Sequence, residues 1–308
     1  MINRVLIRIR ILQIFFSWSQ RESMDLKKAE TELFFSLQKS YDLYHYFLLL
    51  ILELTDEYDR RIEQRKSKLL PSEQDLNPDT QLLDNKFMLQ LRSNLRFNKY
   101  IKDRPFLWSN HDSFVRTLLG EILESDLYKE YCQQTDRTYD VDKDFWRKAF
   151  KQFITANEEL DSILEDESIY WNDDIEIVES FVLKTIKQFD ESNGEYQELL
   201  PMFRDEEDSD YASDLLRNTM LNAKEYWNII EKYTVNWESE RIAQMDMVIM
   251  QIAIAEIMTC PSIPISVSLN EYINIAKSYS TAKSSSFING ILDAVVKELK
   301  ESKKLLKK

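Results

Sequence analysis

Acidic side chains are the residues of this chain whose types and spacing come nearest to a catalytic arrangement. The run 165–167 (Glu-Asp-Glu) and the pair Asp173-Asp174 could supply the two carboxylates of a hydrolase or the ligands of a metal ion. Neither use is supported, because histidine occurs only at His45 and His111 and no nucleophile motif accompanies the acids. Acidic runs on helical proteins are usually solvated faces. We therefore expect no enzyme.

Metal and cofactor chemistry is equally poorly supported. Cys132 and Cys260 are the only cysteines, and they form no Cys-x-x-Cys or Cys/His cluster, which favours a reduced compartment and no structural metal. The three glycines, Gly120, Gly194 and Gly290, are never close neighbours, so a glycine-rich phosphate loop is excluded. We expect no cofactor.

Arginines near the beginning of the chain are better candidates for binding chemistry. The net charge is −14, yet the first 20 residues hold Arg4, Arg8 and Arg10 and no acidic residue. From residue 235 onward nine Lys/Arg face eight Asp/Glu, so the negative charge belongs to the middle of the chain. Arg4 and Arg8 lie one helical turn apart, which predicts an exposed arginine edge on an amphipathic helix. Guanidinium groups at such an edge suit phosphates and unpaired bases.

The elements that must position these side chains are helices. Three glycines and six prolines in 308 residues are too few for a strand-rich fold, so we predict an all-α protein. Helices are expected at about 3–20, in one or two pieces over 25–67, as a long helix over 211–233, at 242–259, from the capping box at Ser268 to about 278, and from about 284 onward. A loop is expected at 72–80. No run is long enough to cross a membrane, and we expect a cytoplasmic protein.

The last third of the chain has the clearest pattern. Glu256 is in phase with the apolar residues Ile249 and Ile252, which predicts a buried carboxylate bonded to a backbone group or an arginine. Phe287 opens the final helix beside Lys283, where a helix N-terminus suits phosphate and an exposed ring could stack on a base. The alternative is that Phe287 simply begins an apolar stripe.

Residues 236–296 resemble the C-terminal half of the NusB family of transcription antitermination factors. The resemblance rests on the order and spacing of Trp237, Arg241, Asp246, Glu256, Asn270, Glu271, Ala276, Lys277, Phe287, Asn289, Gly290 and Leu292. A weaker likeness at the N-terminus rests on Arg4, Arg8, Gln13, Phe16 and Trp18.

The chain also departs from the family. Members are about half as long, which implies an acidic helical insertion at about 21–206 inside an N-terminal subdomain of residues 1–234, followed by a C-terminal subdomain of residues 235–308. The cluster of adjacent arginines is thinned, and Gln251 stands where an arginine is common. These changes bear on RNA affinity more than on the NusB-like double helical bundle that the resemblance implies.

The resemblance also implies functional roles for individual residues. Arg4, Arg8, Lys283 and Phe287 would bind single-stranded boxA-like RNA. Asp246 would contact the small-subunit ribosomal protein that acts as NusE, although a carboxylate near a helix N-terminus is also favoured by the helix dipole. Asn289 and Gly290 are expected to determine the fold, with Gly290 permitting close helix packing.

The function implied is that of an RNA-binding adapter in the transcription elongation complex, acting on nascent ribosomal transcripts. One alternative is a NusB-like protein–protein scaffold that has lost RNA binding, which the thinned arginines and the acidic middle would allow. Another is an RNA methyltransferase, because NusB-like domains occur fused to such enzymes. No cofactor-binding glycine motif supports that second alternative.

Overall fold

The computed structural model describes residues 1–20, 25–102, 104, 108–234, 243–302 and 305, and it divides into two compact units. Unit 1 comprises Met1 and Lys39–Met202, and unit 2 comprises Ile2–Gln38 and Phe203–Lys308. The all-α prediction is confirmed, since the described residues form helices and turns with only an isolated bridge between Ile2 and Phe203 outside them. Among these residues, none of the helices combines the length and apolarity needed to span a membrane.

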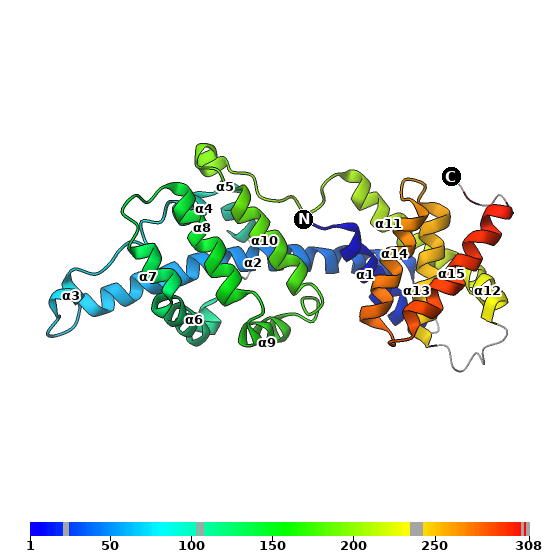
Figure 1. Ribbon diagram of the computed structural model, residues 1–308, viewed down its shortest axis with the longest axis horizontal. Helices are drawn as coiled ribbons and strands as arrows, with labels where there is room; N and C mark the ends of the chain where they lie inside the picture. Colours follow the sequence, from blue (N-terminus) through cyan, green and yellow to red (C-terminus); the bar gives the residue numbers. More distant parts are fainter. Residues whose placement is uncertain (21–24, 103, 105–107, 235–242, 303–304, 306–308) are drawn as a thin grey trace. The chain divides into compact units, whose positions relative to one another are not determined.

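Unit 2 is a bundle built around one central helix (Figure 1). Its elements are α1 (Arg4–Ser19), the beginning of α2 (Leu26–Lys66), α11 (Glu206–Leu221), α12 (Ala223–Thr234), α13 (Gln244–Thr259), α14 (Ile265–Tyr279) and α15 (Ser284–Glu301). Helix α13 contacts α1, α11, α12, α14 and α15, and every residue from Asp246 to Ile257 is buried. A helix that is apolar on all sides belongs at the centre of a core.

Helix α1 departs from the amphipathic pattern that we predicted for it. Asn3 caps it by accepting a hydrogen bond from the Leu6 backbone, and all residues from Leu6 to Leu12 are buried. The helix packs against both α11 and α13, which cover it on more than one side. The expectation of an exposed edge containing Arg8 is therefore wrong.

The long helix predicted over 211–233 is broken in two. Helix α11 ends at Leu221 and α12 begins at Ala223. The side chain of Gln251 on α13 donates a hydrogen bond of 2.8 Å to the backbone carbonyl of Ala223, at the point where the helix is interrupted. The polar side chain that stands in place of an arginine thus satisfies a backbone group at the break.

The capping box predicted at Ser268 is also wrong, because α14 begins three residues earlier at Ile265. Pro264 precedes the first helical residue, a position where a proline loses no helical hydrogen bond. Ser268 and Glu271 therefore lie inside the helix. The final helix begins at Ser284, which confirms that prediction.

Unit 1 is formed by shorter helices placed along the remainder of α2 (Figure 1). They are α3 (Glu73–Leu76), α4 (Lys86–Ser93), α5 (Leu95–Lys102), η1 (Trp108–His111), α6 (Asp112–Glu124), α7 (Asp126–Cys132), α8 (Tyr139–Ala149), η2 (Phe150–Ile154), α9 (Glu158–Glu167), α10 (Ile175–Gln188) and η3 (Glu191–Tyr196). The predicted loop at 72–80 thus contains the single helical turn of α3, where Ser72 and Asp75 form a capping box.

Aromatic side chains of α2 anchor the core of unit 1. Tyr46 stacks on Trp108 with ring centroids 4.1 Å apart, and the Trp108 indole donates a 3.0 Å hydrogen bond to the Tyr46 carbonyl. Tyr44 bonds to Thr185 of α10 at 2.7 Å. The predicted subdomain boundary at 234/235 falls inside unit 2 and stays a prediction, as do the limits of the insertion.

Candidate functional site

Arg8 and Glu256 form a buried ion pair between α1 and α13. The Arg8 Nε lies 2.7 Å from one carboxylate oxygen of Glu256 and Nη2 lies 3.0 Å from the other. Arg8 is only 2% exposed, and Glu256 is fully buried. The prediction that Glu256 is buried and bonded to an arginine is confirmed. The RNA contact predicted for Arg8 requires an accessible guanidinium group. The Arg8 side chain is buried and is not accessible in this structure.

Two tyrosines complete the surroundings of this ion pair. Tyr211 of α11 and Tyr272 of α14 both donate their hydroxyl groups to Glu256, the latter at 3.0 Å. Burial alone would raise the pKa of Glu256, but the hydrogen bond and charge of Arg8 more than offset it and lower the pKa. Burial alone would lower the pKa of Arg8, and the bond to Glu256 raises it above its usual range. Both groups are therefore charged at neutral pH.

Arg4 keeps part of its side chain in solvent. Its Nε lies 3.0 Å from Asp208 and its guanidinium lies 5.1 Å from the Tyr211 ring centroid, while 27% of the side chain stays exposed. Arg10 is buried, and its Nη1 donates a 2.8 Å hydrogen bond to Gln13. Of the three arginines in α1, Arg4 is the one placed to reach a ligand.

Lys283 and Phe287 lie at the start of α15. Lys283 is exposed directly before the first helical residue, and Phe287 follows in the first turn with its ring half-buried. Phe287 is thus neither a fully buried core residue nor a fully exposed stacking platform. The structure brings these two side chains to the same helix end, as expected from their spacing.

Asp246 is engaged inside the protein. The residue is 5% exposed, and its carboxylate accepts hydrogen bonds from the hydroxyl groups of Ser280 and Ser284, the latter at 2.8 Å. These bonds connect the first turn of α13 with the junction of α14 and α15. The contact with a partner protein predicted for Asp246 stays a prediction.

Asn289 and Gly290 lie on an accessible part of α15. A Cβ added to Gly290 would meet nothing within 4 Å, so the expectation that this glycine permits close helix packing is wrong. The Asn289 side chain makes a 3.4 Å contact with Asp293 one turn later. Gly290 is exposed because its face of α15 has no neighbouring helix among the described residues.

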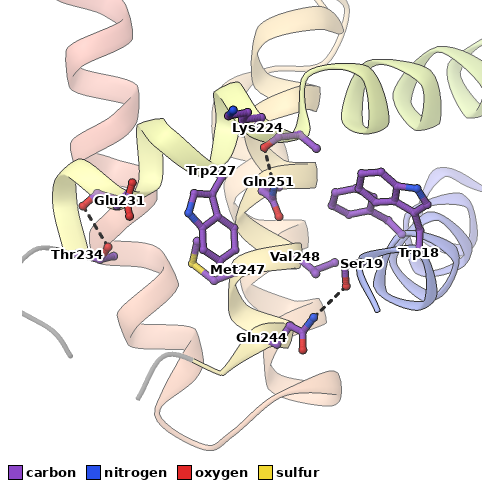
Figure 2. Close-up of a pocket in the computed structure, with 12 residues that line it drawn as sticks. Trp18, Ser19, Lys224, Trp227, Glu231, Thr234, Gln244, Met247, Val248 and Gln251 are labelled. Atoms are coloured by element: carbon purple, nitrogen blue, oxygen red, sulfur yellow. Dashed lines mark hydrogen bonds between the residues drawn. The ribbon is translucent and has the colours of Figure 1, made fainter. Parts of the chain in front are cut away.

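A cavity of about 550 Å³ opens in unit 2 between α1, α12 and the first half of α13. Trp18 of α1 and Trp227 of α12 lie on opposite sides of it, with Met247, Val248 and Gln251 of α13 between them (Figure 2). Trp18 stacks on Phe15 with centroids 5.1 Å apart. The wall is mainly apolar, and its charged residues are one lysine and one glutamate, Lys224 and Glu231.

Sequence reasoning missed Trp227, which is 43% exposed at the rim of this cavity. A large aromatic side chain surrounded by Lys224, Glu225 and Asn228 could have indicated an exposed position. The break between α11 and α12, which presents the ring to the cavity, leaves no comparable pattern in the sequence.

Comparison with known proteins points to one family. A family model described as the NusB family matches residues 175–297. The chain is 35% identical over 132 residues to the transcription antitermination protein NusB of Salinibacter ruber, which covers 41% of this chain and 82% of that relative. The chain belongs to the NusB family.

Other NusB relatives agree with this assignment. The transcription antitermination protein NusB of Thermoanaerobacter sp. strain X514 is 35% identical over 122 residues, covering 38% of this chain and 86% of the relative. The NusB protein of Chloroherpeton thalassium is 44% identical over 91 residues, which are 30% of this chain and less than half, 43%, of that relative. No solved structure matches the chain. Trp237 and Arg241, two positions of the predicted likeness, lie outside the described residues.

Proposed function

We propose that this protein is a transcription antitermination factor that binds boxA-like single-stranded RNA and pairs with the ribosomal protein that acts as NusE. The observation that carries the proposal is the match to NusB relatives, which extends over 82% of the length of the Salinibacter ruber protein. Its place of action would be the elongation complex on nascent ribosomal transcripts. The protein would act there as an adapter without catalytic chemistry of its own.

The RNA-binding part is supported by Arg4, Lys283 and Phe287. Arg4 and Lys283 supply accessible positive charge, and the half-buried Phe287 ring offers a surface on which a base can stack. We leave Arg8 out of the proposed RNA contacts because its guanidinium is held by Glu256. With so few cations, RNA affinity is expected to be weak for the protein alone and higher when a partner extends the surface.

The partner-binding part is supported by the cavity between Trp18 and Trp227. Tryptophan is enriched among residues that dominate the energy of protein interfaces, and an apolar floor favours an apolar side chain of a partner. The lysine and the glutamate in the cavity wall have opposite charges, so the cavity offers little net electrostatic attraction to an RNA phosphate backbone. We therefore assign this cavity to the ribosomal protein rather than to RNA.

The proposal is tested by fluorescence anisotropy of a labelled boxA-type RNA, with the protein alone and with the ribosomal protein present. We expect the partner to tighten RNA binding, and Arg4→Ala and Lys283→Ala each to weaken it. Lys300→Ala, at the opposite end of α15 from Lys283, is the matched control. Trp227→Ala should weaken the protein pair while leaving RNA binding by the protein alone unchanged.

A scaffold without RNA binding is the second candidate, and the burial of Arg8 and Arg10 favours it. Two of the three arginines in α1 are used inside the protein, so only one positive side chain of that helix is accessible. A firm complex with the ribosomal protein, together with no RNA binding at low salt, would establish the scaffold and reject the RNA-binding adapter.

A further inference from the structure

Residues 158–179 of unit 1 contain many acidic side chains and no basic one. They comprise α9, the turn after it and the beginning of α10. Ten of them are Asp or Glu and none is Lys or Arg, in a chain whose net charge is −14. The ten are Glu158, Glu159, Asp161, Glu165, Asp166, Glu167, Asp173, Asp174, Glu176 and Glu179. We call residues 158–179 the acidic segment.

The helix dipole explains only some of these acids. Glu158, Glu159 and Asp161 lie in the first turn of α9, where the positive end of the helix dipole stabilises carboxylates. The run 165–167 (Glu-Asp-Glu) lies in the last turn, which contains no basic residue. Negative charge at a helix C-terminus is unfavourable, and so are like charges one turn apart. The last turn of α9 therefore keeps three acids at a cost to the stability of the helix.

Few of the exposed acids are bound within the protein. The Nε2 atom of His111 lies 2.9 Å from a Glu167 carboxylate oxygen. The Asn172 amide donates a 3.2 Å hydrogen bond to Glu165. Four further acids are exposed and form no ion pair with any residue that the structure describes; these are Glu158, Glu159, Asp166 and Glu176. Their charge is available to a cationic partner.

Two buried carboxylate oxygens of the acidic segment have no hydrogen-bond partner. One belongs to Glu179 of α10, which is only 3% exposed, and the other to Asp161 of α9. Burial, then the charge of Asp161 and to a lesser degree that of Glu176, raise the pKa of Glu179 to about 7. Burial, then the charges of Glu176 and Glu158, also raise the pKa of Asp161. The charged groups that act on this pair are all negative, and a cation would satisfy both oxygens.

The pair of Asp161 and Glu179 lies near the surface of unit 1. Glu176, one turn before Glu179, is exposed, and Asp161 is half-buried. The pair differs from the buried Arg8, whose guanidinium is already bound to Glu256. An incoming ammonium or guanidinium group would have no competing cation to displace.

An apolar side chain is presented beside the acids. Ile169 is 79% exposed in the turn between α9 and α10. The buried Trp171 anchors this turn, because its indole donates a 2.8 Å hydrogen bond to the Lys39 carbonyl. A turn fixed in this way loses little entropy when a partner binds. The acidic segment thus offers one apolar contact next to its charges.

These charges distinguish between classes of partner. The acidic segment would repel the phosphates of RNA. Among the described residues, no group of three His, Cys, Asp or Glu side chains could hold a metal ion. Lysine and arginine supply positive charge at the end of long side chains, which suit both the exposed acids and the carboxylate pair. A protein segment rich in these two residues therefore matches the acidic segment.

We propose that the acidic segment binds a lysine- and arginine-rich segment of the ribosomal protein that pairs with this chain. The identity of the partner rests on the proposed function. A ribosomal protein contacts ribosomal RNA, and RNA-binding surfaces are rich in lysine and arginine. One cationic side chain binds Asp161 and Glu179, others bind the acids in the last turn of α9, and an apolar side chain contacts Ile169. Unit 1 thus has a contact with the partner in addition to the cavity between Trp18 and Trp227.

Biolayer interferometry with the immobilised ribosomal protein and the intact chain tests this proposal, at physiological ionic strength and about pH 8. We expect Glu165→Gln/Asp166→Asn and the single variant Glu179→Gln each to weaken binding about three- to tenfold. The matched control is Glu191→Gln/Glu195→Gln, which removes two exposed charges from η3 of the same unit. It should stay within about twofold of the unaltered protein, because distant charges are largely screened. Equal weakening by the control would show general charge attraction and overturn the inference.

The pH dependence of binding tests the carboxylate pair separately. A cation binds the ionised form of Glu179, so a lower pH opposes binding in the unaltered protein. Its affinity relative to that of Glu179→Gln should rise up to about tenfold between about pH 6 and 8, through the pKa of Glu179. Glu165→Gln/Asp166→Asn should keep this rise. Parallel pH profiles for Glu179→Gln and the unaltered protein would contradict the proposed role of the pair and overturn the inference.

The remaining outcomes separate this inference from the proposed function. No binding of the ribosomal protein to the unaltered chain would reject the proposed pairing and the partner named here. Normal binding that Trp227→Ala weakens and the acidic variants do not would reject only the contact with the acidic segment. Calorimetry with magnesium or calcium ions covers another occupant. Ion binding that Glu179→Gln abolishes, with unchanged pairing by the acidic variants, would overturn the inference in favour of a metal-ion site.

Discussion

Arg8 and Glu256 are bound to each other through two hydrogen bonds, although 248 residues separate them in the sequence. Both side chains are withdrawn from water, where an isolated charge would be strongly disfavoured. The pair joins the first helix of the chain to the central helix of unit 2, and Tyr211 and Tyr272 satisfy the carboxylate further. An arginine expected to bind RNA is thereby a structural element of the bundle.

Replacing Arg8 by alanine is expected to destabilise the protein by about 3–5 kcal/mol, because Glu256 would be left as an unpaired buried charge. Urea denaturation measures the change in the free energy of unfolding. Arg4→Ala, which removes a partly exposed ion pair, is the control and should cost less than about 1 kcal/mol. An Arg8→Met/Glu256→Leu double variant should recover most of the loss. A stable Arg8→Ala protein that has lost RNA binding would return Arg8 to the RNA surface.

Asp246→Asn is expected to lower stability by about 1–2 kcal/mol, since both serine hydroxyl groups would lose a charged acceptor and one of them would face the amide NH2 group instead of an oxygen. Thermal denaturation of the variant measures this loss. Pairing with the ribosomal protein, followed by interferometry below the unfolding temperature, should be unchanged if Asp246 acts only inside unit 2. A weakened complex with unchanged stability would show instead that the carboxylate contacts the partner.

Gly290→Ala is expected to raise the free energy of unfolding by about 0.5–1 kcal/mol, because alanine restricts the unfolded chain and favours the helix. The added Cβ meets no neighbouring atom within 4 Å. Gly120→Ala in α6 is a matched control with the same open surroundings and should give a similar gain. If Gly290→Ala stabilises the protein but weakens RNA or partner binding, the glycine serves close approach of a ligand to α15.

We expect the titration of Glu179 in α10 to make the stability of the protein depend on pH. Burial, and then the charge of Asp161, raise the pKa of Glu179 to about 7. Because its pKa is raised, the folded protein binds the Glu179 proton more tightly than the unfolded chain does. This contribution to stability is fully present below the unfolded pKa and is lost as the pH rises through 7. The free energy of unfolding should therefore decline between about pH 4.5 and 7, and Glu179→Gln should make this decline smaller by about 1–2 kcal/mol after allowance for solvent screening.

Urea titrations at several pH values compare Glu179→Gln with the unaltered protein. Glu195→Gln, an exposed residue of the same unit, is the control and should leave the pH profile as it is. Parallel profiles for Glu179→Gln and the unaltered protein would contradict the assignment of the titration to Glu179.

The helical class and several helix ends could be predicted because they depend on local patterns. The scarcity of glycine and proline indicated helices, and the serines before Phe287 marked the start of α15 correctly. The burial of Glu256 followed from its phase with the apolar residues of α13. Each of these predictions uses residues that are neighbours in the sequence.

The start of α14 was misplaced on local residues, because the helix begins directly after Pro264 and not at Ser268. The other predictions that failed depend on contacts between distant segments. Nothing near Arg8 in the sequence indicates that α11 and α13 enclose it, so its face of α1 could not be recognised as buried. At the break between α11 and α12, the Ala223 carbonyl accepts a hydrogen bond from Gln251, a residue of another helix. The open surroundings of Gly290 likewise depend on which helices pack against α15, and this is a tertiary property.

The division of the chain between the units sets an order for folding during synthesis. Unit 1 is almost entirely one continuous stretch, Lys39–Met202, whereas unit 2 combines Ile2–Gln38 with Phe203–Lys308. The ribosome therefore releases all of unit 1 before the segments that complete unit 2 exist. Helix α1 is synthesised first but can pack in its final position only after α13 has been synthesised. Until then Arg8 lacks its ion-pair partner Glu256. The earliest helix of the nascent protein is thus among the last to reach its final place.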